Sequence, residues 1–147
     1  MEDRTTRPID QLITTYGESH QHPVNEIIHF ICVPTIVFTV LGLIWTLHPL
    51  GALGMALASM LYYVPLSVPM AIGSAIMMAA MLLILALMPQ QLIGQVSILV
   101  FVLAWIGQFI GHKIEGKKPS FFDDLRFLMV GPVFVMSFLF RRFHIRY

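Results

Sequence analysis

Apolar residues run along this chain in long blocks that only short polar stretches separate. Four such blocks occupy residues 27–47, 50–64, 70–88 and 92–111. A helix of about 20 apolar residues is long enough to cross the hydrocarbon of a bilayer. The second block is short for a span unless its helix extends towards Val68. The pattern therefore predicts an all-α fold, a multi-pass transmembrane helical bundle with four spans.

Prolines at the block boundaries predict where the helices begin and end. Pro23 suits the first position of a helix, where no backbone N–H is needed, and it disfavours helix at His22 before it. We therefore expect the first spanning helix to begin at Pro23 and to reach about Leu47, with Pro34 as a candidate kink. The predicted turns, none of which carries a charge, are residues 48–51, 65–69 and 89–91.

The two ends of the chain are more polar than its middle. Near the N-terminus, a helical turn or two is expected between Asp10 and Tyr16. The last apolar run, residues 127–140, contains Pro132 and is too short to span readily, so it is predicted to be a re-entrant or interfacial helix. The chain is thus expected to be a single transmembrane domain over residues 1–147. It comprises a polar segment at 1–26, the four spans within 27–111, and a polar loop, short helix and basic tail in 112–147.

Charge is confined to the two ends of the sequence. The chain is 57% hydrophobic and 12% charged, against roughly 25% charged residues in typical soluble domains. No Asp, Glu, Lys or Arg occurs from Ile27 to Gly111, and the loops of a soluble protein would not stay uncharged for so long. A net charge of +1 without a basic stripe argues against nucleic-acid binding. Cys32 is the single cysteine, so no intrachain disulfide can form.

Four spans return the chain to the side of the membrane on which it starts. Residues 1–26 and 112–126 then share one face, and a last helix that does not span adds the basic tail to that face. Lys and Arg concentrate on the cytoplasmic side of membrane proteins. We therefore expect cytoplasmic termini, in the inner membrane of a bacterial cell or the endoplasmic reticulum membrane of a eukaryotic one.

Most of the histidines fall on this predicted cytoplasmic side. Side chains three and four residues apart share one face of a helix. Two polar stripes have this spacing and are expected to meet at one membrane face. The first comprises His22, Asn25, Glu26 and His29, and the second comprises Trp105, Gln108, His112 and Glu115. His20 precedes the break before Pro23, so it can fold back towards the same point.

These stripes suggest a metal site. Imidazole and carboxylate ligands that leave positions for oxygen and substrate are typical of non-haem iron centres. His20, His29 and His112 could supply the ligands, with Glu115 or Asn25 as a further ligand or as a group that orients one. Polar groups at membrane depth are costly, which makes their presence a functional hypothesis.

The same residues admit structural interpretations. His29 could be a hydrogen-bonded polar residue among the spans, and His112 could cap the end of the fourth helix. His22 could simply precede a helix. Glu115 could pair with Lys118 at i+3. The two remaining histidines, which we expect at the surface, are His48 and His144.

Two segments resemble the signatures of a known family. They are Tyr16-Gly-Glu-Ser-His-Gln-His-Pro-Val-Asn-Glu-Ile-Ile-His29 and Trp105-Ile-Gly-Gln-Phe-Ile-Gly-His-Lys-Ile-Glu-Gly-Lys-Lys-Pro119. With residues 121–128 and Gly131-Pro132 they resemble the yeast-type 2-hydroxy fatty acid dioxygenases over nearly the whole chain. Those are small multi-pass membrane proteins.

The resemblance implies an Fe(II)-dependent dioxygenase that shortens 2-hydroxy fatty acids by one carbon, a step of fatty acid α-oxidation. Where the family pattern has Asn, this chain has His22, which makes His22 a candidate extra ligand. The positions that the resemblance carries over as metal ligands are His20, His29 and His112, and those that it places around them as catalytic candidates are Asn25, Gln108 and Glu115.

We therefore expect a membrane enzyme whose partners are a 2-hydroxy fatty acid, molecular oxygen and the lipid bilayer, while the oligomeric state stays open. The substrate head could chelate the iron through its hydroxyl and carboxylate, with Lys113, Lys117 or Arg126 holding the carboxylate. The alternative is a non-enzymatic membrane scaffold or lipid-binding protein whose histidines are structural. A transporter is disfavoured because no charged residue lies within the spans.

Overall fold

The computed structural model describes residues 7–18, 20–116 and 129–146, and every regular element within them is a helix. The helices are α1 (Pro8–Glu18), α2 (Pro23–Leu47), α3 (Pro49–Leu66), α4 (Val68–Leu87), α5 (Gln90–Glu115) and α7 (Val130–Arg142). Four of them, α2 to α5, are long and apolar enough to cross a membrane. The predicted all-α fold with four spans is therefore confirmed.

Histidine–proline pairs begin two of the spanning helices. Nδ1 of His22 accepts a hydrogen bond from the Val24 N–H, and Nδ1 of His48 accepts one from the Leu50 N–H, each at 3.2 Å. The proline that follows each histidine lacks the N–H that the first helical position would leave unused. Both histidines thus act as N-caps, at opposite ends of α2.

Two of the observed helices, α3 and α5, are longer than the apolar blocks from which they were predicted. The predicted turn at residues 65–69 shortens to Ser67, because α3 continues through Pro65 to Leu66 and α4 begins at Val68. The helix of the fourth span continues beyond its apolar block through His112 to Glu115, as the shared helical face of Gln108, His112 and Glu115 requires. It then ends at Gly116, whose φ of 75° is the left-handed conformation that glycine adopts at helix C-termini.

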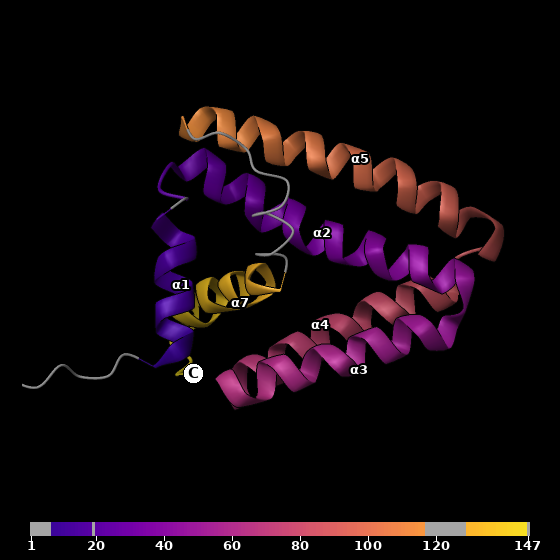
Figure 1. The fold of residues 1–147 in the computed structure, drawn as a ribbon, viewed down its shortest axis with the longest axis horizontal. Helices are drawn as coiled ribbons and strands as arrows, with labels where there is room; N and C mark the ends of the chain where they lie inside the picture. The colour runs from indigo at the N-terminus through magenta and orange to yellow at the C-terminus, as the bar shows by residue number, and fades with distance from the viewer. Residues whose placement is uncertain (1–6, 19, 117–128, 147) are drawn as a thin grey trace, which may run out of the picture.

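The spanning helices form two antiparallel pairs (Figure 1). One pair is α2 with α5, and the other is α3 with α4. The pairs approach each other at the end where the chain turns from α2 into α3 and from α4 into α5, and they diverge towards the other end. There α7 contacts α1, α2 and α4. The two short helices therefore pack at the end of the bundle where α2 begins and α5 ends.

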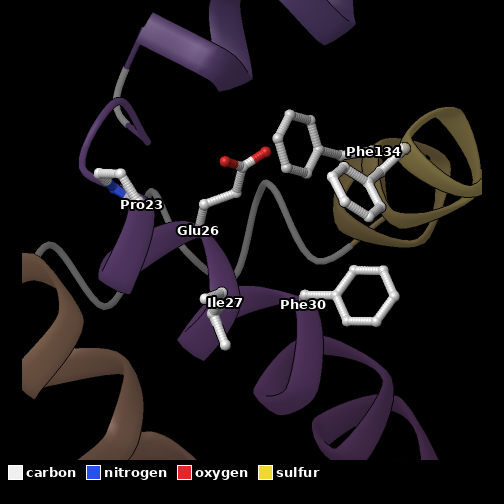
Figure 2. A pocket seen from close by; sticks show the side chains of 6 residues that line it. Pro23, Glu26, Ile27, Phe30 and Phe134 are labelled. Carbon is white, nitrogen blue, oxygen red and sulfur yellow. The ribbon is translucent and has the colours of Figure 1, made fainter. Parts of the chain in front are cut away.

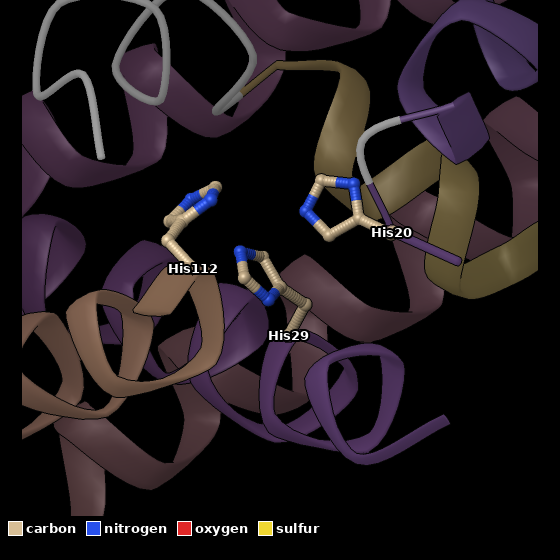
Figure 3. Close-up of side chains that lie close together, drawn as sticks. All are labelled: His20, His29 and His112. Carbon is tan, nitrogen blue, oxygen red and sulfur yellow. The ribbon is translucent and has the colours of Figure 1, made fainter. Parts of the chain in front are cut away.

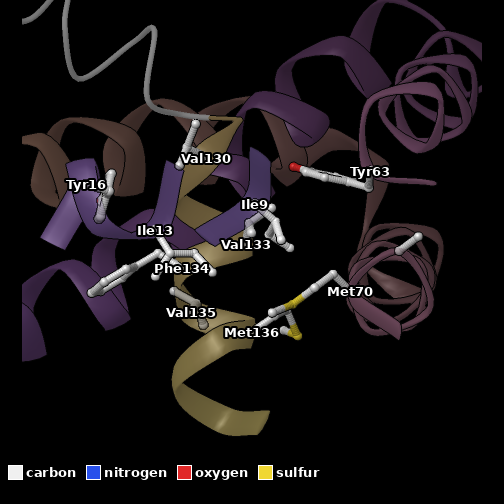
Figure 4. Close-up of a cluster of buried hydrophobic side chains, with 11 residues drawn as sticks. Ile9, Ile13, Tyr16, Tyr63, Met70, Val130, Val133, Phe134, Val135 and Met136 are labelled. Carbon is white, nitrogen blue, oxygen red and sulfur yellow. The ribbon is translucent and has the colours of Figure 1, made fainter. Parts of the chain in front are cut away.

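The largest apolar cluster surrounds α7 (Figure 4). All residues from Val130 to Ser137 are buried, and Ile9, Ile13 and Tyr16 of α1 pack against them. The side chains of Tyr63 and Met70 extend the cluster to α3 and α4. With 13 residues, α7 is too short to cross a bilayer, as the sequence predicts. It stabilises the diverging end of the bundle by burying apolar surface.

Small residues let α2 and α5 approach closely. A Cβ atom at Gly107 of α5 would lie 2.9 Å from Sγ of Cys32, and one at Gly94 would lie 3.3 Å from the methyl group of Thr46. Glycine allows such close backbone packing between helices in a membrane, where dispersion contacts rather than the hydrophobic effect hold helices together. This seam fixes how the side chains of α2 face those of α5.

Candidate metal centre

Three histidines from separate segments meet at the end of the α2–α5 pair (Figure 3). His20 precedes α2, His29 lies in the second turn of α2, and His112 lies in the last turn of α5. The imidazole centroids are 4.1 Å apart for His20 and His29, 4.9 Å for His29 and His112, and 5.9 Å for His20 and His112. Their exposed fractions are only 7, 2 and 5%. The structure thus gathers three polar rings in a buried place.

Backbone carbonyls fix the orientation of two of these rings. Nδ1 of His20 lies 2.7 Å from the Tyr16 carbonyl oxygen, and Nδ1 of His29 lies 3.0 Å from the Asn25 carbonyl oxygen. Because a carbonyl only accepts, Nδ1 of each ring donates its proton to it, so Nε2 is the nitrogen that each ring can offer to a metal ion. Histidine ligands of metals commonly have such an arrangement, which sets both tautomer and ring direction.

The spacing of the three rings fits a metal ion. Each ring offers one nitrogen, and these atoms lie within 4.8 Å of one another. Imidazole nitrogens bind a divalent ion at about 2.1 Å, so two of them on opposite sides of one ion lie about 4.2 Å apart. Small side-chain rotations would therefore bring all three rings into bonding distance. Three protein ligands leave further positions on the ion open for a substrate or oxygen.

Two aromatic rings hold His20 in place. Tyr16 stacks on His20 with a centroid distance of 4.2 Å and an angle of 8° between the ring planes. Phe134 of α7 lies 4.7 Å from the ring of Tyr16 and 6.1 Å from that of His20. The spacing of Ile9, Ile13 and Tyr16 puts all three on the face of α1 that packs against α7. The amphipathic pattern of α1 therefore places Tyr16 against α7, where its ring holds His20 in position.

The carboxylate of Glu115 binds the segment that carries His20. Its Oε1 accepts a hydrogen bond from the Gln21 N–H at 3.0 Å, and its Oε2 accepts one from the His22 N–H at 2.9 Å. The side-chain amide of Asn25 donates a third bond to Oε2 at 3.0 Å. Within the described part of the chain, the three-histidine group includes no carboxylate. Glu115 therefore joins the end of α5 to the start of α2 and acts on the histidines through the backbone.

We expect Glu115→Gln to lower metal affinity and turnover about tenfold, as the loss of groups that orient ligands commonly does. The amide offers one acceptor oxygen and a donor, so at least one of the three donors from the α2 segment would face another donor. Iron content and oxygen-dependent turnover of the purified variant check this.

The matched control for Glu115 is Lys118→Ala. If Glu115 served only in a salt bridge with Lys118, which lies outside the described residues, both substitutions would have equal and small effects. Exposed pairs at i+3 or i+4 contribute only about 0.3–0.5 kcal/mol. Equal effects of the two variants would contradict the positioning role.

Gly111 of α5 packs closely against Asn25 of α2 beside the cluster. A Cβ atom at Gly111 would collide with Oδ1 of Asn25. Asn25 is fully buried, and its amide donates a hydrogen bond to Glu115, so these two sequence candidates act together. Gln108 is buried one turn before His112 on the same face of α5. Gly111 is a position that the sequence alone did not single out, although its place next to His112 was a usable signal.

The other predicted site residues lie elsewhere. His22 is exposed and caps α2, so the structure does not bring it into the cluster. Lys113 is exposed on the last turn of α5, while Lys117 and Arg126 lie outside the described residues. His48 caps α3 at the far end of the bundle, and His144 follows α7 at the surface. Tyr16 and Phe134 were missed as site residues because only packing reveals their contact with His20.

These features define a class of protein, a small multi-pass helical membrane protein with a buried group of three histidines at one end of its bundle. The family model described as 2-hydroxy-palmitic acid dioxygenase Mpo1-like matches residues 6–143, and the chain belongs to this Mpo1-like family. A curated relative is the 2-hydroxy-palmitic acid dioxygenase MPO1 of Saccharomyces cerevisiae, 31% identical over 133 residues that cover 86% of this chain and 76% of the relative. No solved structure matches the chain significantly.

Proposed function

We propose that this protein is an Fe(II)-dependent dioxygenase that shortens 2-hydroxy fatty acids by one carbon at the membrane interface. The observation that carries the proposal is the buried group of His20, His29 and His112 in a chain of the Mpo1-like family. The activity in the name of the yeast relative supports the same reaction class and the same kind of substrate.

Iron is the metal that best suits both a site of three histidines and a reaction with dioxygen. Imidazole ligands suit zinc, copper, iron and nickel alike. Activation of dioxygen requires a redox-active centre, and this excludes zinc. When bound, the iron would supply dioxygen activation. His20, His29 and His112 would hold it. Glu115 would position His20 through its hydrogen bonds to the following backbone, and Asn25 would position His29 through its carbonyl oxygen.

The chain itself would bind the substrate and exclude water. Cleavage of the bond between C1 and C2 by one dioxygen molecule balances if the products are the fatty acid shorter by one carbon, carbon dioxide and water, with no further reductant. Tyr16 and Phe134 pack against His20 and would keep bulk water from the reacting carbons. Lys113, together with Lys117 and Arg126, would attract the substrate carboxylate to this end of the bundle.

Reaction of the purified protein tests the proposal. The protein is loaded with Fe(II) without oxygen, and 2-hydroxypalmitate and oxygen are then added. Mass spectrometry should show the fatty acid that is one carbon shorter, and palmitate without the 2-hydroxyl group should not yield it. A protein that binds lipid but neither holds iron nor forms this product would instead be a lipid-binding protein or scaffold with structural histidines.

The membrane orientation is a separate prediction. We expect residues 5, 118 and 146 to face the cytoplasm, because all Lys and Arg residues lie in segments that four spans place on one side. Single cysteines at these positions, in a Cys32→Ala background, should react with an impermeant thiol reagent only when the cytoplasmic side is accessible. Labelling of position 118 from the side opposite to position 5 would contradict the count of four spans.

A further inference from the structure

A groove between α2 and α7 lies beside the histidine cluster (Figure 2). It has a volume of about 290 Å³, close to the lower end of the range for small-molecule pockets. Four of its residues come from α2 at helical spacing, and two come from α7. They are Pro23, Glu26, Ile27, Phe30, Phe134 and Phe138. The walls are therefore apolar except at Glu26.

The groove adjoins the candidate metal centre through Phe134. Phe134 lines the groove, and its ring centroid also lies 6.1 Å from that of His20. Glu26 precedes His29 by three residues on α2, a spacing that puts their Cβ atoms about 5–6 Å apart. At the other side, Phe30 and Phe138 close the wall with ring centroids 5.4 Å apart. A molecule with its head at the histidines could thus extend its tail into this groove.

Glu26 is the unusual residue of this groove. Its half-buried carboxylate points from α2 towards the phenyl rings of α7 (Figure 2). Within the described ranges, no hydrogen bond or ion pair engages this carboxylate. An ionised group among apolar side chains is costly unless a donor satisfies it. A carboxylate accepts hydrogen bonds and repels other carboxylates, so it suits a ligand with a hydroxyl group at the boundary between head and tail.

We propose that the α2–α7 groove binds the acyl chain of the substrate and that Glu26 accepts a hydrogen bond from its 2-hydroxyl group. This inference rests on the proposed function for the identity of the head group. Glu26 lies one helical turn from His29 on α2, and the other residues that line the groove are apolar. The order along a 2-hydroxy fatty acid is the carboxylate, then the hydroxyl group, then the chain. Repulsion by Glu26 directs the substrate carboxylate to the histidines rather than into the groove.

Filling the groove tests the position of the chain. Ile27 is 60% exposed, so Ile27→Trp should fold while placing an indole against the groove. Each methylene kept out of an apolar site costs about fourfold in kcat/KM, so excluding two of them should lower kcat/KM for the long chain on the order of tenfold and favour shorter acids. The matched control is Ile72→Trp on the outer face of α4, which should leave the chain-length profile unchanged.

A direct binding readout accompanies the kinetics. 2-Hydroxypalmitate with a diazirine near its methyl end should label peptides of α2 and α7 in the wild-type protein, and unlabelled 2-hydroxypalmitate should compete. Labelling of α3 or α4 alone, or an unchanged chain-length profile in Ile27→Trp, would overturn the position of the chain. If the groove is labelled but no shortened acid forms, the proposed function fails while the groove remains a binding site.

Substitution of Glu26 tests the hydroxyl contact. A hydrogen bond to a charged group is worth roughly tenfold or more in affinity. Glu26→Leu should therefore lose about that much of the preference for 2-hydroxypalmitate over palmitate in competition with the diazirine probe. Glu26→Gln, which keeps an acceptor oxygen, should retain part of the preference. A preference that is equal in all three proteins would show that Glu26 does not contact the hydroxyl group.

Discussion

Replacing His29 by alanine should abolish metal binding and oxygen-dependent turnover together. His29 is central to the cluster, since its ring is 4.1 Å from that of His20 and 4.9 Å from that of His112. Loss of a group that merely orients a ligand lowers metal affinity about 10–100-fold, and loss of the ligand itself should exceed this. His20→Ala and His112→Ala should have the same effect. Iron per chain, measured on purified protein, and the yield of shortened acid are the two readouts.

Two other histidines provide controls for this prediction. His22 and His48 each cap a helix through Nδ1 and lie outside the cluster. Loss of an N-cap costs about 1 kcal/mol of stability, so His22→Ala and His48→Ala should unfold slightly more easily but keep iron and turnover. Full iron content in His29→Ala would remove the metal hypothesis. Loss of iron in His22→Ala, beyond what its stability change explains, would make His22 a ligand after all.

Gly111→Ala should have the second largest effect, although glycine has no side chain to contribute to chemistry. The added methyl group would meet Oδ1 of Asn25 at the close contact between α5 and α2. Either Asn25 rotates and loses its bond to Glu115, or the two helices separate and carry His112 away from His29. Overpacking of this kind costs about 1–3 kcal/mol, and we expect metal affinity to fall at least about tenfold.

Gly54→Ala is the matched control. Gly54 also lies within a spanning helix, α3, but a Cβ atom there would meet nothing within 4 Å. Because alanine favours a helix by about 1 kcal/mol relative to glycine, this variant should be neutral or slightly more stable. Thermal unfolding and iron content of both variants check the comparison. Equal iron content in Gly111→Ala and wild type would mean that the contact with Asn25 does not position the cluster.

The sequence by itself determined the helices and the segments that meet. The long uncharged stretch from Ile27 to Gly111 requires a non-aqueous environment, and Pro23 marks a helix start because of its fixed φ and missing N–H. The predicted turn at residues 48–51 is shorter in the structure, since α3 already begins at Pro49. Spacings of three and four residues placed Gln108, His112 and Glu115 on one face of a helix. These features depend on local chemistry and on the bilayer, so they can be predicted without knowing how the helices pack.

Only the tertiary structure decided what each polar residue of the site contacts. Spacing put His112 and Glu115 on one face, but packing directs the imidazole to the cluster and the carboxylate to the backbone of residues 21 and 22. The contact of Phe134 with His20 joins segments far apart in sequence, and no local pattern encodes it. The physical reason is that helical periodicity fixes the direction of a side chain around its own axis, whereas the contacts it makes depend on which small residues let the neighbouring helix approach.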